Sequence, residues 1–585
     1  MHAKLMSRRQ ALRTAILGTA GMGAAAVLAA CGEEKVVEKV VTQEVIKEVE
    51  VIKEVPVEVM VPGGAEEQVL RFGTSAEMGS LDNQADPNSE PSRAVIANIL
   101  ENLTRYGYKA TSKGTRTKDH NSVVPWLAEG YEIADDAKSV TYRLRQGITF
   151  GDGTPLTAQD VAYSMERSLT IPGIPAFILG VIGNFTAETK PEVIDEMTVK
   201  MHLTPGANSF TILSATEMGP YAPIMNSKAL QAHATSNDPW AQEWAATVEG
   251  AASIGTGPWI VEEFESTRFL LRGRQDYWGG SDYSARPAVG AIEGTVITDA
   301  TQRALLLREG AIDMTEQLLL KDLKEFDDDP AFTVHHAPGS EHHYLALNMS
   351  EPPFDDVRVR QALNHALPRQ QLVDQLTFGF ARAAEGPVPS ICFGYQPYYQ
   401  QYEYNLDKAR QLIQDAGHSD GFSFTVSQDE SSAIQGQALQ VLAGELSKIN
   451  VNMEIQRLSS AAVLEGCDLR EDGTQQAQCV AATMNWPPLI FDAAYFMIFG
   501  YKSDSRSNWS RWGTSETDDL ITAAVAELDA SSKFEKVAEI QQRIADQSPR
   551  VPFLDVDSHV VSTNRVEDVR IMDVWPRFED IRVTS

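Results

Sequence analysis

The chain has 585 residues, of which 43% are hydrophobic and 22% are charged, as in ordinary globular proteins with room for several domains. Its formal net charge of −31 disfavours binding to nucleic acid or to an anionic membrane surface, because both require clustered lysine and arginine. Four cysteines are too few for a fold that is built on disulfides.

The first 30 residues have the pattern of an export signal. A basic head that includes Arg8 and Arg9 precedes an uncharged segment, Thr14 to Ala30, which is shorter than the roughly 20 residues of a membrane-spanning helix. Leu28-Ala29-Ala30-Cys31 resembles a bacterial lipobox, with Cys31 as the acylated first residue of the mature chain. The arginine pair resembles a twin-arginine signal, so Tat and Sec export both stay open. We expect an extracytoplasmic lipoprotein anchored to the outer face of the cell membrane.

Residues 31–66 are expected to form a tether between that membrane and a globular body. The segment repeats valine and isoleucine with glutamate and lysine. Alternation from Val55 to Val61 is typical of an extended chain, whereas the spacing of Val41, Val45 and Val49 is typical of a helix, so the conformation stays open. A spacer is favoured over a coiled-coil arm for oligomerisation, and we expect a monomer.

The globular body begins near Glu67 and alternates predicted strands with predicted helices. Its first strand is 69–74, and an apolar stripe predicts a helix over 92–103. Thr157 and Asp160 predict a helix start with an acidic form of the capping box. Further strands are predicted at 140–144, 344–347 and 451–455, and further helices at 301–308, 357–367, 406–416, 433–449 and 516–529. The alternation indicates α/β layers.

Several short motifs are spread through this body. They are PWLAE at 125–129, YRLRQGITF at 142–150, DGTPLTAQDV at 152–161, GTGPW at 255–259, PPFDDVRVRQAL at 352–363, NLDKARQL at 405–412 and SPRVPF at 548–553. Together they resemble the family 5 extracellular solute-binding proteins, the peptide/nickel-type binding components of ABC transporters. The resemblance implies an α/β, two-lobed periplasmic-binding-protein-like fold of class II, with an extra subdomain in the first lobe.

The same resemblance suggests a division of the chain. Residues 1–30 form the export signal and 31–66 the tether. Lobe I combines 67–110, 255–345 and 555–585, the extra subdomain is 111–254, and lobe II is 346–554. The implied partners are a small-molecule solute and the permease subunits of an ABC transporter, with no nucleic acid and no cofactor.

An enzyme is not expected, because the sequence contains no G-x-S-x-G, H-E-x-x-H, P-loop or G-x-G-x-x-G motif. Two alternatives to a transporter component stay open. One is a lipoprotein that presents its ligand to a sensor, and the other is an extracytoplasmic hydrolase.

The resemblance places solute contacts in loops that face the cleft between the lobes. The candidate residues are Pro87, Asn88, Ser89, Thr256, Gly257, Tyr344, Asn348, Trp486, Leu489, Phe491 and Asp492. Trp486 matches an aromatic residue of the family's pocket, and a rigid ring buries much area at little entropic cost. Plain interlobe core is the alternative interpretation of Trp486.

Leu489 departs from the peptide-binding members, which carry an aspartate three residues after that tryptophan. Burying a peptide's α-ammonium without a carboxylate is costly, so we expect a neutral organic compound or saccharide rather than a free peptide. Asp492 is able to replace the missing carboxylate or to cap a turn, and an oligopeptide ligand therefore remains the alternative.

Cysteines and histidines predict one disulfide and no metal site. Cys467 and Cys479 flank a polar loop and are expected to be bonded outside the cytosol, which leaves Cys392 free and buried. Four histidines at 335, 336, 342 and 343 invite a metal interpretation, but adjacent residues of a strand point to opposite faces. We therefore expect these histidines to be solvated or to serve as caps.

Overall fold

The computed structural model describes residues 68–584 except for 85–89, 112–114, 205–208, 218, 280–286, 469–478, 487–489, 528 and 573–574. The predicted export signal, Cys31 and the tether therefore lie outside the described residues. Within the described ranges, no helix combines the length and the apolar character needed to cross a membrane.

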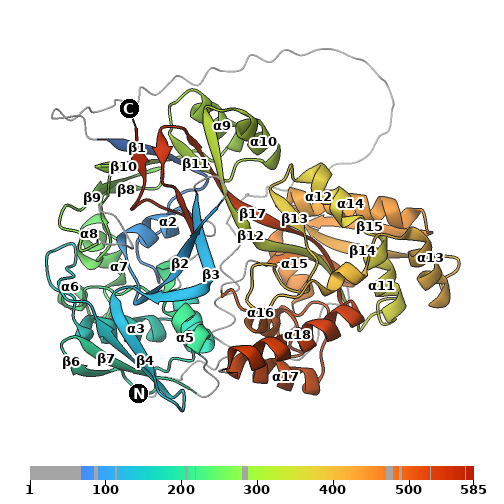
Figure 1. The fold of residues 1–585 in the computed structure, drawn as a ribbon, viewed down its shortest axis with the longest axis horizontal. Helices are drawn as coiled ribbons and strands as arrows, with labels where there is room; N and C mark the ends of the chain where they lie inside the picture. Colours follow the sequence, from blue (N-terminus) through green and yellow to red (C-terminus); the bar gives the residue numbers. More distant parts are fainter. Residues whose placement is uncertain are drawn as a thin grey trace, which may run out of the picture.

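One mixed sheet of 11 strands runs through both lobes (Figure 1), and ten of its strands follow the order β15-β14-β16-β12-β17-β11-β1-β10-β9-β8 while β13 pairs with β17. The strands are β1 (Val69–Thr74), β8 (Trp259–Glu265), β9 (Arg268–Gly273), β10 (Ala291–Val296), β11 (Met314–Glu316), β12 (Phe332–Leu347), β13 (Ala381–Ala383), β14 (Phe422–Asp429), β15 (Val451–Leu458), β16 (Ala481–Trp486) and β17 (Arg550–Thr563). We call the part of the molecule around β1 and β8–β11 the first lobe, and the part around β13–β16 the second lobe.

The antiparallel pair of β12 and β17 joins the two lobes. At one end the pair binds β11 of the first lobe, and at the other end β12 binds β16 of the second. Register shifts between Ala337 and Glu341 and between His343 and Tyr344 interrupt the pair. Such bulges bend a strand and increase its twist, so the connection between the lobes is curved.

In the second lobe, helices cover a sheet that is partly parallel. β14 pairs in parallel with both β15 and β16, as crossover connections require. Leu345, Val426, Leu439 and Val551 belong to one buried core under these helices. The helices of this lobe are α11 (Val357–Ala366), α12 (Arg369–Leu376), η4 (Tyr398–Gln401), α13 (Leu406–Asp415), α14 (Ala433–Ser447), α15 (Ser460–Cys467), α16 (Ala493–Gly500), α17 (Ser515–Ala526) and α18 (Ala530–Gln547).

In the first lobe, strands β1 and β10 pair in parallel around a core that includes Leu70, Phe72 and Ile292. The helices of this part are α2 (Glu90–Ile99), α6 (Ser227–His233), α7 (Gln242–Ala245), α8 (Val248–Ile254), α9 (Ala300–Arg308) and α10 (Leu320–Asp328). α2 contacts both β8 and the C-terminal strand β20 (Trp575–Arg577), so the end of the chain closes this lobe.

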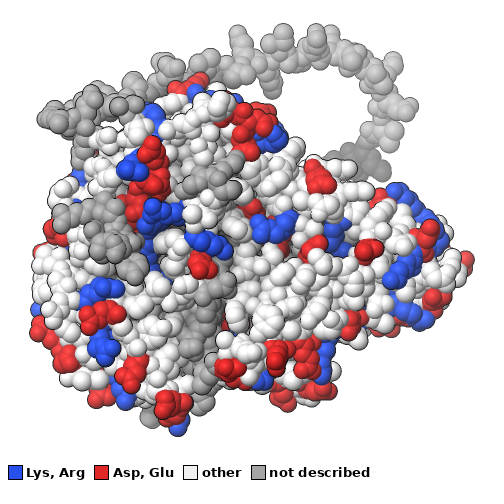
Figure 2. All heavy atoms as spheres, in the orientation of Figure 1, with Lys and Arg blue, Asp and Glu red and all other residues white. Residues whose placement is uncertain are grey.

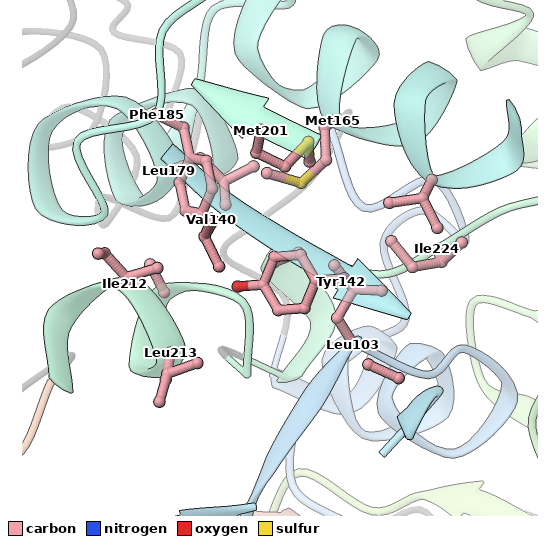
Figure 3. Packing of buried hydrophobic residues seen from close by; sticks show 14 of the residues in the cluster. Leu103, Val140, Tyr142, Met165, Leu179, Phe185, Met201, Ile212, Leu213 and Ile224 are labelled. Carbon is pink, nitrogen blue, oxygen red and sulfur yellow. The ribbon is translucent and has the colours of Figure 1, made fainter. Parts of the chain in front are cut away.

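A separate four-stranded sheet, β4-β5-β7-β6, forms the extra subdomain and lies at the lower left of Figure 1. Figure 3 shows its core, in which Tyr142 of β5 points among the buried side chains of Val140, Met201 and Ile212. The elements are β4 (Ala128–Ile133), β5 (Ser139–Leu144), α3 (Ala158–Thr170), α4 (Ile174–Phe177), η2 (Ile178–Ile182), β6 (Glu192–Asp195), β7 (Thr198–His202), α5 (Ser209–Ala215) and η3 (Gly219–Tyr221).

Two small sheets complete the fold. β2 (Thr104–Ala110) and β3 (Arg116–Pro125) form a hairpin, to which the C-terminal strands β19 (Arg570–Met572) and β20 are added. β18 (Val566–Glu567) pairs with β21 (Arg582–Val583). The predicted boundary between residues 110 and 111 therefore lies inside the β2–β3 hairpin, and the domain limits as a whole stay a prediction.

Local sequence patterns were good guides to several elements. β1 has the predicted bounds, and the capping box forms, because the Asp160 carboxylate accepts a hydrogen bond of 2.9 Å from the Thr157 backbone N–H. The helix predicted over 92–103 runs over 90–99 instead. The strand predicted over 344–347 is the last quarter of the 16-residue β12, whose earlier part contains Pro338 and Gly339 and lacks a clean alternation.

Candidate functional site

The β2–β3 hairpin and the segment after β16 bring the two lobes into contact. The rings of Tyr106 and Phe491 meet edge to face, with centroids 5.8 Å apart. The Lys118 ammonium lies 4.9 Å from the centre of the Tyr106 ring and 5.7 Å from that of Phe491. The site therefore lies where a strand of the first lobe faces the second lobe.

A hollow of about 400 Å³ lies against this hairpin and β19. Its lining residues are Arg105, Tyr106, Gly107, Tyr108, Lys109, Ala110, Arg116, Val124 and Arg570. The lining thus contains four cationic side chains and no carboxylate. In Figure 2, Lys and Arg side chains gather near the middle of the face, over the region in which Figure 1 labels β2 and β3. The volume is within the usual range of small-molecule sites, about 300–1,000 Å³.

Two of these cations, Arg105 and Lys109, lie on β2. Arg105 is the buried one, with 8% of its surface exposed. Its guanidinium lies 3.9 Å from the centre of the Trp126 ring and 4.7 Å from that of Tyr108. Its Nη2 atom has no hydrogen-bond partner within the described part of the chain. The Glu579 carboxylate is 3.7 Å away, too far for a hydrogen bond.

The charge of Arg105 is maintained in spite of burial. Burial lowers the pKa of Arg105, but Tyr108, Glu579, Tyr277 and Glu101 together raise it by more, so the pKa lies above its ordinary value. Burial likewise raises the pKa of Glu579, and the cations Arg577, Arg105 and Arg570 lower it below the ordinary value. Both side chains are therefore ionised at neutral pH.

The other arginines of the hollow have carboxylate partners. Arg570 Nη1 lies 3.2 Å from Glu579 and its other nitrogen pairs with Asp580. Arg116 lies 3.3 Å from Asp580 and 4.0 Å from Asp568. The guanidinium of Arg570 also lies 4.5 Å from the centre of the Tyr108 ring, so that Tyr108 contacts two cations.

A second, much smaller hollow of about 10 Å³ shares Arg105 and Tyr108 with the first. Asn102 lines it and is 4% exposed, and neither its amide nitrogen nor its oxygen has a hydrogen-bond partner among the described residues. This space is comparable to that of one water molecule. It adds an amide donor and acceptor beside Arg105.

Glu101 fixes the aromatic residue on which Arg105 lies. Its buried carboxylate accepts hydrogen bonds from Trp126 (2.9 Å), Tyr277 (2.7 Å), Trp278 (2.9 Å) and Thr256 (2.8 Å). Burial raises the pKa of Glu101, although these four donors lower it in part. The other three donors hold the Glu101 carboxylate in place, and its bond with Trp126 Nε1 fixes the indole, whose ring centre lies 3.9 Å from the Arg105 guanidinium.

Two of the predicted contact residues, Thr256 and Gly257, lie in this support. Thr256 is fully buried and donates to Glu101, while Gly257 donates its N–H to the Ile99 carbonyl at 3.0 Å. A Cβ atom at Gly257 would lie 2.6 Å from that carbonyl oxygen, which explains the glycine. Their predicted contact with a solute stays a prediction.

Tyr344 and Asn348 lie at the end of β12 and are buried. The Tyr344 hydroxyl donates to the Met484 sulfur at 2.8 Å, and the Arg550 guanidinium lies 4.1 Å from the centre of its ring. Asn348 donates to the Cys479 carbonyl at 3.1 Å. These contacts join β12 to its neighbours, and solute contact by either residue remains a prediction.

Asp492 caps a helix, as one of its two predicted interpretations requires. Its carboxylate accepts a hydrogen bond of 2.8 Å from the Ala494 N–H at the start of α16 and forms a buried ion pair with Lys533. Trp486 ends β16 opposite His342 of β12, and nothing is described of its side chain. Pro87, Asn88, Ser89 and Leu489 lie outside the described residues.

The predicted disulfide between Cys467 and Cys479 is present, and Cys392 is free and buried, as expected. The expectation of solvated histidines is wrong for three of the four, since His335, His342 and His343 are at most 5% exposed. His342 lies 2.7 Å from Asp555 and His335 2.7 Å from Thr115, so buried polar partners replace solvent. No cluster able to hold a metal ion occurs among the described residues.

The family model of the bacterial extracellular solute-binding proteins, family 5 Middle, matches residues 122–508. The chain belongs to this family. Among curated proteins, this family 5 protein is 26% identical over 447 residues to the glutathione-binding protein GsiB of Salmonella typhimurium, covering 73% of this chain and 80% of the relative. GsiB of Escherichia coli K12 is 25% identical over 447 residues, with the same coverage.

Solved structures have the same fold. HbpA2 from Haemophilus parasuis aligns with a TM-score of 0.74 at 21% identity, covering 88% of this chain and 100% of the other. DppA from Helicobacter pylori, in complex with the peptide STSA, aligns with a TM-score of 0.68 at 22% identity, covering 89% and 99%. These likenesses confirm the predicted two-lobed fold.

Proposed function

We propose that this family 5 protein is an extracytoplasmic lipoprotein that binds a small organic solute between its lobes and delivers it to the permease of an ABC importer. The observation that carries the proposal is the hollow of about 400 Å³ beside the contact between Tyr106 and Phe491. Its lining residues come from β2, β3 and β19, and one of them, Tyr106, contacts Phe491 of the second lobe, so movement of the lobes would change the contact at the edge of the hollow. Binding that favours the closed state would thereby present the solute to a transporter.

The proposed anchor is a lipid on Cys31, followed by residues 32–66 as a spacer. A chain of this length reaches about 50 Å as a helix and about 100 Å when extended. That reach would keep the globular body close to a membrane-embedded permease. Mass spectrometry of membrane-extracted protein should find an acylated N-terminal cysteine, whereas an unmodified chain starting at Met1 in the cytosol would contradict this localisation.

The proposed pocket combines the hollow with the predicted contact residues near Trp486. Leu489 in the place of an aspartate favours a solute without a free α-amine, such as a saccharide or another organic compound. The alternative is an oligopeptide, which is favoured by the glutathione-binding relatives. N-acetylation separates the two, because only the peptide alternative requires a free α-amine.

Thermal unfolding in the presence of candidate solutes tests the function. A solute that binds only the folded protein stabilises it by RT ln(1 + [L]/Kd), about 2.7 kcal/mol at a hundredfold excess over Kd. We expect saturable stabilisation by at least one member of a panel of saccharides, peptides and organic acids, confirmed by calorimetric titration. Turnover of the bound compound would instead favour a hydrolase.

A further inference from the structure

We propose that the hollow against β2, β3 and β19 binds a carboxylate group of the solute, and that Arg105 is the residue that contacts it. The inference deepens the proposed function and rests on it, since it names the chemical class of the solute. It differs from the sequence-based expectation of a neutral solute, which depends on Leu489 alone.

The first argument is the state of Arg105. A charged donor that is 8% exposed and lacks a hydrogen-bond partner on Nη2 within the described residues is unfavourable, because it has given up water without replacement. Two other buried arginines are paired by the protein: Arg167 pairs with Asp82 at 2.6 Å, and Arg369 donates to the Pro552 carbonyl at 2.9 Å. Guanidinium nitrogens without a partner among the described residues also occur in Arg303 and Arg550, but neither of these lines the hollow as Arg105 does. An anionic group in the hollow would supply the acceptor that Arg105 lacks.

The second argument is the balance of charge. Arg105, Lys109, Arg116 and Arg570 line the hollow, and among the described residues ion pairs join these cations to Glu579, Asp580 and Asp568, none of which lines it. Asp568 also pairs with Arg582, and Arg577 also lowers the pKa of Glu579, so these carboxylates are shared with further cations. The hollow therefore has a cationic wall, which favours an anionic group of the solute.

The third argument is preorganisation. The guanidinium lies 3.9 Å from the centre of the Trp126 ring and 4.7 Å from that of Tyr108, and Glu101 fixes Trp126 by a hydrogen bond of 2.9 Å. A planar cation that is held by contacts with two rings loses little conformational freedom on binding, so most of its interaction energy remains available for the ligand. The amide of Asn102, which also lacks partners within the described residues, lies in the smaller hollow that Arg105 shares.

The remaining lining residues limit the size and polarity of the rest of the solute. Gly107, Ala110 and Val124 contribute small or apolar surface next to the cations. Together with a volume of about 400 Å³, this wall fits a small organic acid or the acidic end of a short peptide.

The test uses calorimetric titration of the full-length protein with matched pairs of compounds. Each acid in a panel of organic acids, di- and tripeptides and glutathione is compared with its amide or ethyl ester, and saccharides and inorganic phosphate are included. We expect at least one acid to bind and its neutral partner to bind about 10- to 100-fold more weakly, as for the loss of a charged hydrogen bond.

Three variants complete the test. Arg105→Met removes the charge and keeps the apolar stem, and it should weaken the acid to the level of its neutral partner. Arg105→Lys keeps the charge and should retain part of the affinity. Arg272→Met is the matched control, because Arg272 lies on β9 in an ion pair with Glu262 at 2.9 Å and does not line the hollow. If Arg105→Met does not fold, the inference is tested instead by the affinity of the lysine variant and by the matched acid and neutral compounds on the wild-type protein.

The outcomes are distinguishable. If a solute binds equally well as acid and amide, or if Arg105→Met leaves its affinity unchanged, the carboxylate inference is wrong while the proposed function stands. Binding of inorganic phosphate as tightly as the acids, with the same dependence on Arg105, would contradict the preference for a carboxylate. If no compound binds at all, the proposed function and this inference fall together.

Discussion

Two regions of the protein bury arginine side chains, and they do so in different ways. In the second lobe, Arg369 donates to the carbonyls of Pro552 (2.9 Å) and Tyr402 (3.2 Å), and Arg360 donates to the Phe354 carbonyl (2.6 Å). In the first lobe, Arg105 faces a hollow, and its Nη2 has no such partner among the described residues. Arg360 and Arg369 thus serve as internal connectors, whereas Arg105 keeps an unsatisfied donor nitrogen.

The difference separates stability from binding. Burial lowers the pKa of Arg360 and of Arg369 to about 10, so both remain protonated at neutral pH and are held by carbonyl oxygens. Removing such a residue leaves buried carbonyl groups unsatisfied. Removing Arg105 breaks no hydrogen bond of Nη2 and leaves Glu579 paired with Arg570 at 3.2 Å, so it should cost less stability than removing Arg369.

The largest effect is expected for Arg369→Met. The substitution removes the donors to Pro552, Tyr402 and Asn364, and it should lower the free energy of unfolding by about 3 kcal/mol or more. Urea unfolding measures the change. A loss below about 1 kcal/mol would show that the carbonyl-bound arginines are not structural connectors.

Removal of the Cys467–Cys479 disulfide by paired serine substitution should have a somewhat smaller effect. The bond closes a loop with a sequence separation of 12, for which chain entropy predicts about 3 kcal/mol before any relaxation of the unfolded state. The melting temperature should fall while solute affinity stays the same, because the disulfide lies in the second lobe away from Arg105. Parallel loss of affinity would place the solute on the second lobe instead.

Glu101→Gln should separate positioning from charge in the first lobe. Each carboxylate oxygen of Glu101 now accepts two hydrogen bonds, and the amide NH₂ group of glutamine would face two of these donors instead. The unfolding free energy should therefore fall by about 1–3 kcal/mol. Solute affinity should fall as well, since Trp126 loses its fixed orientation under Arg105.

The Glu101→Gln substitution should also change how stability depends on pH, in a direction that follows from the pKa of Glu101. Because the folded-state pKa of Glu101 is raised by burial, the folded protein binds its proton more tightly than the unfolded chain does. The contribution of Glu101 to stability is therefore fully present below its unfolded pKa and is lost as pH rises through the folded pKa. The stability difference between wild type and Glu101→Gln should shrink over that rise, and a difference that grows would contradict the assigned direction.

The sequence predicted the fold, whereas the contact residues that it suggested remain predictions. Joint motifs such as those around Thr157 and Asp356 fix local turns and helix starts, and they identify a two-lobed fold without knowledge of long-range contacts. Trp486 and Leu489 were predicted to contact the solute because they match positions of the family's pocket. Arg105 was not predicted to do so, although Arg-Tyr-Gly-Tyr-Lys at 105–109 places cations and aromatics together on one strand.

The reason is that the hollow depends on residues distant in sequence. Arg570 and Glu579 come from the C-terminal end of the chain, and β19 reaches β3 only through tertiary pairing. Asp492 shows the converse, because a carboxylate that was a candidate for ligand binding is used by a helix start and by Lys533. Sequence spacing does not reveal which buried charges the fold itself satisfies.

The most direct test of this account is urea unfolding of Arg105→Met, measured without and with an acidic solute that stabilises the wild-type protein. The account predicts that the unfolding free energy without solute falls by less than it does in Arg369→Met, while the stabilisation by the solute is lost. A variant that loses stability without solute as Arg369→Met does, or that keeps the full stabilisation by the solute, would contradict the role of Arg105.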